Sequence, residues 1–100
     1  MAAYMIAEID ITDSAGYEEY KTGVPATIAA HGGRYLARAG ATEVLEGDRS
    51  GKRIVILEFP SMSRLKAWYD SPEYERLRHI RWKCSTGRVV AIEGVAASPS

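Results

Sequence analysis

The sequence has little that would build a disulfide framework, a metal centre or a membrane anchor. Cys84 is the one cysteine among 100 residues, which excludes an intrachain disulfide and a cysteine-built metal site. His31 and His79 have no partner at a metal-ligand spacing, so neither a metal nor a cofactor is predicted. No apolar run approaches the roughly 20 residues of a membrane span. The N-terminus lacks the basic start and long apolar stretch of a signal peptide, so a cytoplasmic location without a membrane partner is the default expectation.

A net charge of either sign is also missing, because thirteen Lys and Arg residues balance thirteen Asp and Glu residues. A neutral chain has little bulk attraction to nucleic acid or to an anionic membrane. Residues 61–88 hold seven basic against three acidic side chains, but no nucleic-acid motif accompanies them. A solvated helix face explains this excess better, and no nucleic-acid partner is predicted.

The composition, 46% hydrophobic and 26% charged, is that of an ordinary globular chain. One hundred residues leave no room for a second core, so a single domain is predicted over residues 1–95. Small and polar residues fill positions 96–100, and this tail is expected to fray.

Four strands are predicted from period-two alternation, apolar runs and turn residues. Alternation over 4–11 and the nearly continuous apolar run over 53–59 indicate the first and third strands. The second is expected from Arg34, bends at Gly40 and resumes over 44–46. Turn residues over 47–51 then join it to the third strand as a hairpin. The last strand is predicted over 89–95, after Gly87 ends the preceding helix.

Two helical regions separate these strands. Asp13 or Ser14 is expected to cap the first, and the Gly32-Gly33 pair to end it. Pro25 lacks a backbone donor and clashes with the preceding turn, so the sequence predicts a break or kink there and a second short helix beginning near Pro25. Ser61 is expected to cap the second region, which Ser71-Pro72 restarts.

The resulting order, β-α-β-β-α-β, is typical of a ferredoxin-like α+β sandwich with both helical regions on one face of a four-stranded antiparallel sheet. Met5, Ala7, Ile9 and Ile11 are predicted to lie beneath the helices. The opposite face then carries a mixture of aliphatic and carboxylate side chains, among them Ile6 and Glu8. Leaving such a face in water is costly, and a second copy of the same sheet is its simplest cover. A homodimer is therefore predicted, with a monomer that exposes its sheet as the alternative.

Several segments resemble one bacterial family over nearly the whole chain. They are residues 4–9, 30–38, 44–48, 56–61, 67–74 and 92–95. The most specific are His-Gly-Gly-Arg-Tyr at 31–35 and Trp-Tyr-Asp-Ser-Pro-Glu-Tyr at 68–74. In these segments the chain resembles the domain-of-unknown-function 1330 family, within the dimeric α+β barrel superfamily.

This resemblance implies a ferredoxin-like subunit and a dimer with facing sheets, and it implies no established activity. Proteins with the same barrel include cofactor-free quinone-forming monooxygenases, muconolactone isomerases and heme-dependent enzymes, but a shared fold is a poor guide to chemistry. Residues 78–84 are heavier and more basic than the family's usual helix, and only Ile80 and Arg81 match its common pattern there.

Glu58 is the most suggestive candidate for chemistry, because it is an acid within an otherwise apolar strand. A carboxylate there needs a partner or a raised pKa. Arg34 and Arg38 share one face of the neighbouring predicted strand and are its candidate partners. In the functional interpretation Glu58 is a general base, Arg34 and Tyr35 hold a developing oxyanion, and Arg38 binds a ligand carboxylate or enolate. In the structural interpretation the same residues form an ion pair that organises the sheet or the dimer.

Four aromatic residues, Tyr35, Trp68, Tyr69 and Tyr74, could line a pocket for a planar small molecule. Core packing is the alternative and is favoured for Tyr69 and Tyr74. Trp68 lies about 100° from the apolar stripe of its helix, so it is predicted to edge a cleft or to meet a partner. Trp68, Tyr69 and Arg81 are accordingly the further ligand-binding candidates.

Two residues are given structural roles. His31 is expected to satisfy a carbonyl at the end of its helix, and Cys84 to be a small buried apolar residue.

Two functional hypotheses of different class follow. In the first, the chain is a cofactor-independent enzyme that moves a proton on a small enolisable or phenolic molecule. In the second, it is a dimeric module that binds a small apolar acid, or only assembles, without catalysis.

Overall fold

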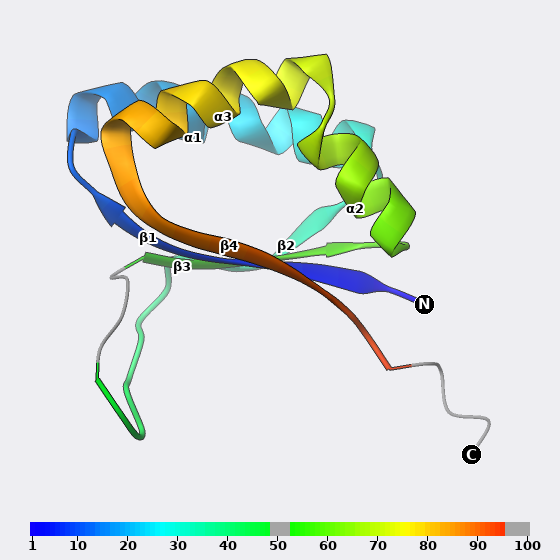
Figure 1. The fold of residues 1–100 in the computed structure, drawn as a ribbon, viewed down its shortest axis with the longest axis horizontal. Helices are drawn as coiled ribbons and strands as arrows, with labels where there is room; N and C mark the ends of the chain where they lie inside the picture. Colours follow the sequence, from blue (N-terminus) through cyan, green and yellow to red (C-terminus); the bar gives the residue numbers. More distant parts are fainter. Residues whose placement is uncertain (49–52, 96–100) are drawn as a thin grey trace.

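Four antiparallel strands form a sheet that carries the helices on one face (Figure 1). The computed structural model describes residues 1–48 and 53–95. The strands are β1 (Ala3–Ile11), β2 (Arg34–Arg38), β3 (Arg53–Phe59) and β4 (Ser85–Glu93), in the spatial order β2-β3-β1-β4. The helices are α1 (Ser14–Ala30), α2 (Met62–Tyr69) and α3 (Pro72–Cys84). This arrangement confirms the predicted ferredoxin-like α+β class.

The central strand β1 follows the predicted alternation. It pairs with β3 on one side and β4 on the other, and Ala3, Met5, Ala7 and Ile9 are buried beneath the helices. Leu57 and Phe59 of β3 are buried on the same side. The predicted inward face is therefore correct for Met5, Ala7 and Ile9, but wrong for Ile11, which lies exposed at the end of β1. The alternate residues of β1 and β3 form the uncovered face.

The helix starts agree with the predicted caps, but Pro25 does not break α1. The helix runs through Pro25 without interruption from Ser14 to Ala30, so the predicted second short helix is wrong. Packing against α3 and burial of one face in the core stabilise the helix, although Pro25 cannot donate to the carbonyl four residues earlier. The three capping side chains are those of Asp13, Ser61 and Ser71, which accept hydrogen bonds from the backbone N–H groups of Gly16, Arg64 and Tyr74.

The second strand is shorter than predicted. It ends at Arg38, Ala39 follows with a positive φ of 54°, and residues 44–46 are not a strand. The irregularity lies between Tyr35 and Ala37, not at Gly40, because the pairing with β3 shifts there by one residue. Only part of the predicted 47–51 turn is described, and the 96–100 tail lies outside the described residues.

The last strand begins directly after α3, at Ser85, so the prediction that Gly87 ends the helix is wrong. Gly87 lies inside β4 opposite Ile9, with φ of 146°. A Cβ at this position would collide with the backbone carbonyl of Glu8. Glycine is needed here because the two strands approach too closely for any side chain.

An aromatic core fills the space between the two layers. Trp68, Tyr74 and Phe59 are the largest of its fully buried side chains. The rings of Trp68 and Tyr74 lie 4.1 Å apart between centroids, and those of Trp68 and Phe59 5.3 Å. Within residues 1–48 and 53–95, no helix combines the length and the apolar composition needed to cross a membrane.

Candidate functional site

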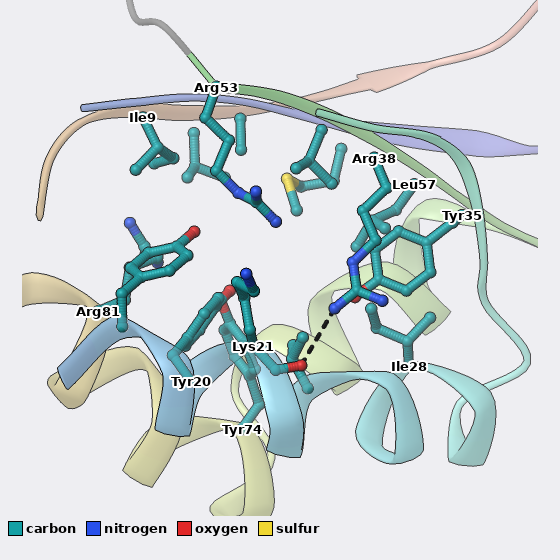
Figure 2. A pocket seen from close by; sticks show the side chains of 16 residues that line it. Ile9, Tyr20, Lys21, Ile28, Tyr35, Arg38, Arg53, Leu57, Tyr74 and Arg81 are labelled. Atoms are coloured by element: carbon teal, nitrogen blue, oxygen red, sulfur yellow. Dashed lines mark hydrogen bonds between the residues drawn. The ribbon is translucent and has the colours of Figure 1, made fainter. Parts of the chain in front are cut away.

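A small cavity lies between the helices and the sheet, toward the β2–β3 side of the core (Figure 2). Aliphatic residues of β1, β3, β4 and α1 make up half of its lining residues, and tyrosines and basic residues make up the other half. Water centres can occupy ≈ 30 Å³ of the cavity. The empty space measures ≈ 430 Å³ when the open mouth is included. The cavity as it stands therefore has room for about two water molecules. A ring-sized ligand would require side chains of the wall to move apart.

The charged lining of this cavity is entirely basic. Arg38 from β2, Arg53 from β3, and Lys21 and Arg81 from the helices reach it, and no carboxylate is among the described side chains that line it. Lys21 already has an anionic partner, since its Nζ lies 3.0 Å from the carboxylate of Glu18. The three arginines give the cavity a positive potential.

Two of these guanidinium groups hold buried N–H donors that nothing in the described protein accepts. The Nε atoms of Arg53 and Arg81 are buried and have no hydrogen-bond partner. Arg81 is only 6% exposed, so its charge is largely removed from water. A buried charged donor without an acceptor is costly.

Arg38 is fixed at the mouth of the cavity by the proline in α1. Pro25 leaves the carbonyl of Lys21 without its helical partner, and Arg38 donates to that carbonyl at 3.1 Å (Figure 2). The Arg38 guanidinium also lies over the Tyr35 ring, 4.6 Å from its centroid. This cation–π contact orients Tyr35 toward the cavity.

Two tyrosine hydroxyl groups meet at the helix side of the cavity. The hydroxyl oxygens of Tyr20 and Tyr74 lie 2.7 Å apart in a hydrogen bond. Burial raises the pKa of both phenols, most strongly for Tyr20, whose hydrogen bond to Tyr74 raises it further. For Tyr74, the charge of Arg81 and the hydrogen bond with Tyr20 offset part of this rise in pKa. Burial likewise raises the pKa of Tyr35. All three phenols are therefore neutral near pH 7.

The structure separates the predicted catalytic residues onto opposite faces of the sheet. Arg34 donates to Glu58 at 2.7 Å on the uncovered face, as the register of β2 and β3 requires. Tyr35 pairs with Leu57 and lines the cavity on the other face. The hydrogen bond from Arg34 lowers the pKa of Glu58, and one from Tyr4 adds to this effect. Glu58 is thus an ionised ion-pair partner, and the sheet lies between it and Tyr35.

The expectation that Arg38 shares a face with Arg34 is wrong. The register shift at Leu36 turns Arg38 to the side of Val55, which is the helix face, where it joins Tyr35. An inserted residue in a strand reverses the alternation that follows it.

Trp68 and Tyr69 occupy different environments. Trp68 is 0% exposed in the core and donates from its indole N–H to Thr27, so it does not edge a cleft. Tyr69 is half-buried and lines a second, shallow hollow together with Arg81 and Trp82. Arg81 is the residue of this group that also lines the cavity between the helices and the sheet.

The two structural expectations are confirmed. The Nδ1 atom of His31 lies 3.0 Å from the carbonyl of Thr27, and Cys84 is buried. Among the residues that the structure describes, no three His, Cys, Asp or Glu side chains are grouped to hold a metal ion.

Sequence reasoning missed Arg53, Tyr17 and Tyr20 as members of the site. Arg53 stands in the same alternation as Val55 and Leu57, which places it on the inner face of β3. The three-residue spacing of Tyr17 and Tyr20 places both on the buried face of α1, where they also line the cavity. The alternation of β3 predicts the position of Arg53. No pattern in the sequence predicts the contact between the hydroxyl groups of Tyr20 and Tyr74.

Fold and cavity together define a ferredoxin-like α+β protein with a basic, tyrosine-lined cavity between its layers. Residues 2–95 match the model of the family described as domain of unknown function DUF1330, and the chain belongs to that family. No protein with a curated description matches the sequence.

Solved structures share the fold at low identity. A protein of unknown function, RPA0582 from Rhodopseudomonas palustris, has a TM-score of 0.76 and 14% identity over 96% of this chain and 84% of that one. SnoaB from Streptomyces nogalater, a cofactor-independent oxygenase, has a TM-score of 0.68 and 13% identity over 99% and 98% of the two chains. A dimeric protein of unknown function with a ferredoxin-like fold, from Bacteroides fragilis, has a TM-score of 0.59 and 14% identity over 93% and 96%.

Proposed function

We propose that this chain binds a small planar acid of the phenol or enol class in the cavity between helices and sheet, and holds it as the anion. The observation that carries the proposal is the pair of buried, unpartnered Nε donors of Arg53 and Arg81 beside a cavity whose described lining has no acid. The apolar and tyrosine walls suit the ring of such a ligand, and the arginines suit its oxygen.

A basic wall changes the chemistry of the ligand as well as its affinity. Nearby positive charge favours the ionised form of a phenol or enol and so lowers its pKa. No histidine or carboxylate is among the described lining, so the anion is supplied by loss of a proton to solvent. An enolate or phenolate is more electron-rich than its neutral parent, which makes it the form able to react without a cofactor.

This chemistry supports a cofactor-independent enzyme, and SnoaB, which has the same fold, is a cofactor-independent oxygenase. The same cavity also fits a non-catalytic binding module, because its described wall holds no evident proton acceptor. Turnover of a bound enol or phenol separates the two: consumption favours the enzyme, and recovery of unchanged ligand favours the module.

Absorbance titration with 4-nitrophenol tests the binding proposal, because only the phenolate of this probe absorbs strongly in the visible. We expect the bound probe to ionise at a lower pH than the free probe. Arg53→Met and Arg81→Met should each weaken its binding about tenfold, the expected loss of one charge-assisted hydrogen bond. Arg34→Met, on the other face, should leave binding unchanged. Circular dichroism confirms that each variant is folded.

Several outcomes would overturn the proposal. The probe could fail to bind the native protein, or could bind with the pKa it has in water. It could also bind folded Arg53→Met and Arg81→Met as tightly as the native chain.

We further propose that a second copy of the chain covers the uncovered sheet face. Ile6, Ile54 and Ile56 form its centre, and Val90 and Ile92 of β4 extend it, with Ile92 55% exposed. The Arg34–Glu58 and Arg88–Glu8 pairs flank this apolar strip. An apolar strip with balanced charges at its edges suits a two-fold, self-complementary contact. The dimeric protein from Bacteroides fragilis has the same fold.

Sedimentation velocity tests this assembly. The native chain should sediment as twice its 11.0 kDa mass, and Ile92→Glu should sediment as the monomer. Trp82→Glu, a matched change at an exposed site on α3, should remain dimeric. A native chain that sediments only as the monomer at high concentration would refute the assembly.

Glu58 and Arg34 lie on the sheet face that the second copy would cover. A role for Glu58 as a base therefore belongs to a chamber between the two facing sheets. Loss of turnover in Glu58→Gln would support that role.

A further inference from the structure

Three arginine charges around the cavity have no counter-charge in the described chain. Arg38, Arg53 and Arg81 line the cavity, and none of the ion pairs among the described residues includes one of them. Like charges that converge on one cavity repel each other, and they do so more strongly where water is scarce. One phenolate or enolate oxygen would neutralise one of the three charges. The charges therefore favour a ligand with more than one negative group.

The arginines stand on different sides of the cavity and at different depths. Arg38 belongs to β2, whereas Arg81 lines the shallow hollow together with residues of β4, and these two strands are the opposite edges of the sheet. Figure 2 shows Arg38 and Arg81 on opposite sides of the cavity, with Arg53 reaching in from the sheet between them. Arg81 is buried, and Arg38 is exposed at the mouth. A ligand that meets both arginines must therefore carry its negative groups at opposite ends.

The difference in depth decides which group lies at which end. A carboxylate is already charged near pH 7, so moving it from water into a buried site is costly. At the exposed mouth it keeps part of its hydration. A phenol or enol can enter as the neutral molecule and ionise inside, where the buried Nε donors of Arg53 and Arg81 await a single oxygen. The ionisable hydroxyl therefore belongs inside and the carboxylate at the mouth.

Arg38 is held in a position that suits a carboxylate. One of its terminal nitrogens donates to the Lys21 carbonyl, and its guanidinium lies over the Tyr35 ring. These two contacts fix the group and leave most of its N–H donors for a ligand. A guanidinium presents paired N–H donors that match the two oxygens of a carboxylate.

We propose that the ligand carries a carboxylate as well as the phenolic or enolic hydroxyl, at opposite ends, and that Arg38 binds the carboxylate while Arg53 and Arg81 bind the ionised hydroxyl. This inference rests on the proposed binding of a phenol- or enol-type acid. It narrows that class to ring acids with the substitution pattern of 4-hydroxybenzoate, and it makes Arg38 the residue that selects them.

Isothermal titration calorimetry with 4-hydroxybenzoate and 4-hydroxybenzamide tests the inference, because the amide has the same shape without the carboxylate charge. The native chain should bind the acid about tenfold more tightly than the amide, the effect of one charge-assisted contact. Arg38→Met should abolish this preference by weakening the acid and leaving the amide nearly unchanged. Arg81→Met should weaken both ligands to a similar extent, because both carry the hydroxyl that Arg81 binds.

Two further variants serve as controls. Arg76→Met removes the same charge from an exposed site on α3, where Arg76 pairs with Glu19 outside the cavity lining, and it should keep the preference for the acid. Arg38→Lys retains the charge and should keep part of the preference. Circular dichroism confirms that each variant is folded, and the comparison of the two ligands on the native chain requires no variant.

The inference is overturned if the native chain binds the acid and the amide equally, if folded Arg38→Met keeps the preference, or if Arg81→Met abolishes it in place of Arg38→Met. Loss of the preference in Arg76→Met would likewise overturn it, since net charge alone would then explain the result. A native protein that binds neither these ligands nor 4-nitrophenol overturns the proposed function, and this inference with it. Binding of 4-nitrophenol without a preference for the acid overturns this inference alone.

Discussion

Arg38 on β2 donates a hydrogen bond of 3.1 Å to the backbone carbonyl of Lys21 in α1. This carbonyl is the one that would accept from residue 25 if that residue were not a proline. The proline thus creates an acceptor within a helix, and an arginine from a neighbouring strand occupies it. The contact ties the edge of the sheet to the helix at the mouth of the cavity.

This relationship predicts a coupling between positions 25 and 38. Arg38→Ala should lower the free energy of unfolding by about 1 kcal/mol in the native chain, the usual effect of losing one hydrogen bond. In a Pro25→Ala background the helix supplies its own donor to Lys21, so the same change should have a smaller effect. Chemical denaturation of the four proteins gives the coupling. Equal effects of Arg38→Ala in both backgrounds would disprove it, and Arg34→Ala is the uncoupled control.

Alkaline stability should report the buried tyrosines. Burial raises the pKa of Tyr20 and Tyr74 in the folded chain above the ordinary 10.0, which the unfolded chain retains. The unfolded chain therefore loses these protons first, so stability is unaffected below about pH 10 and falls as the pH rises further. The slope is at most about 1.4 kcal/mol per pH unit for each tyrosine. Denaturation from pH 8 to 11 should show a shallower fall for Tyr20→Phe/Tyr74→Phe, and an unchanged slope would contradict this prediction.

The two tryptophans should differ sharply in their effect on stability. Trp68 is fully buried between Tyr74 and Phe59, so Trp68→Ala should lower the free energy of unfolding by about 3–5 kcal/mol. Trp82 is 56% exposed, and Trp82→Ala should change it by about 1 kcal/mol or less. Urea denaturation measures both. Similar losses for the two variants would place Trp68 outside the core.

The Arg34–Glu58 pair should titrate as an ion pair. The hydrogen bond from Arg34 lowers the pKa of Glu58 in the folded chain, so Arg34→Ala should raise it toward the ordinary value of 4.5. Because the folded pKa is the lower one, the pair stabilises the fold above the unfolded pKa, and this contribution is lost as the pH falls through the folded pKa. Carboxyl resonances followed by NMR through acid pH measure the shift. A Glu58 pKa that stays the same without Arg34 would reject the pair.

Most of the architecture follows from local chemistry that the sequence displays. Alternation in β1 and β3, the caps at Asp13, Ser61 and Ser71, and the proline after Ser71 are all short-range signals, and the structure keeps them. Long-range packing cannot be predicted from such short-range signals. The helix α1 continues through Pro25 because tertiary contacts stabilise it, although the local sequence favours a break there.

The candidate site was harder to predict because it depends on one inserted residue and on the meeting of distant helices. The shift beside Leu36 moves Arg38 from the face of Glu58 to the face of Tyr35, and no residue in that stretch signals a bulge. The hydroxyl contact between Tyr20 and Tyr74 joins positions 54 residues apart. Sequence periodicity gives the face on which each tyrosine lies, but not the partner that it meets.

NMR of the arginine Nε–H groups during titration with 4-nitrophenol tests the central claim most directly. The buried Nε–H groups of Arg53 and Arg81 have no acceptor in the described protein, so their resonances should move downfield as the phenolate binds. The Nε–H of Arg34 donates to Glu58 on the opposite face of the sheet, so its resonance should not move. Movement of the Arg34 signal, with those of Arg53 and Arg81 unchanged, would place the ligand on the other face and contradict the account.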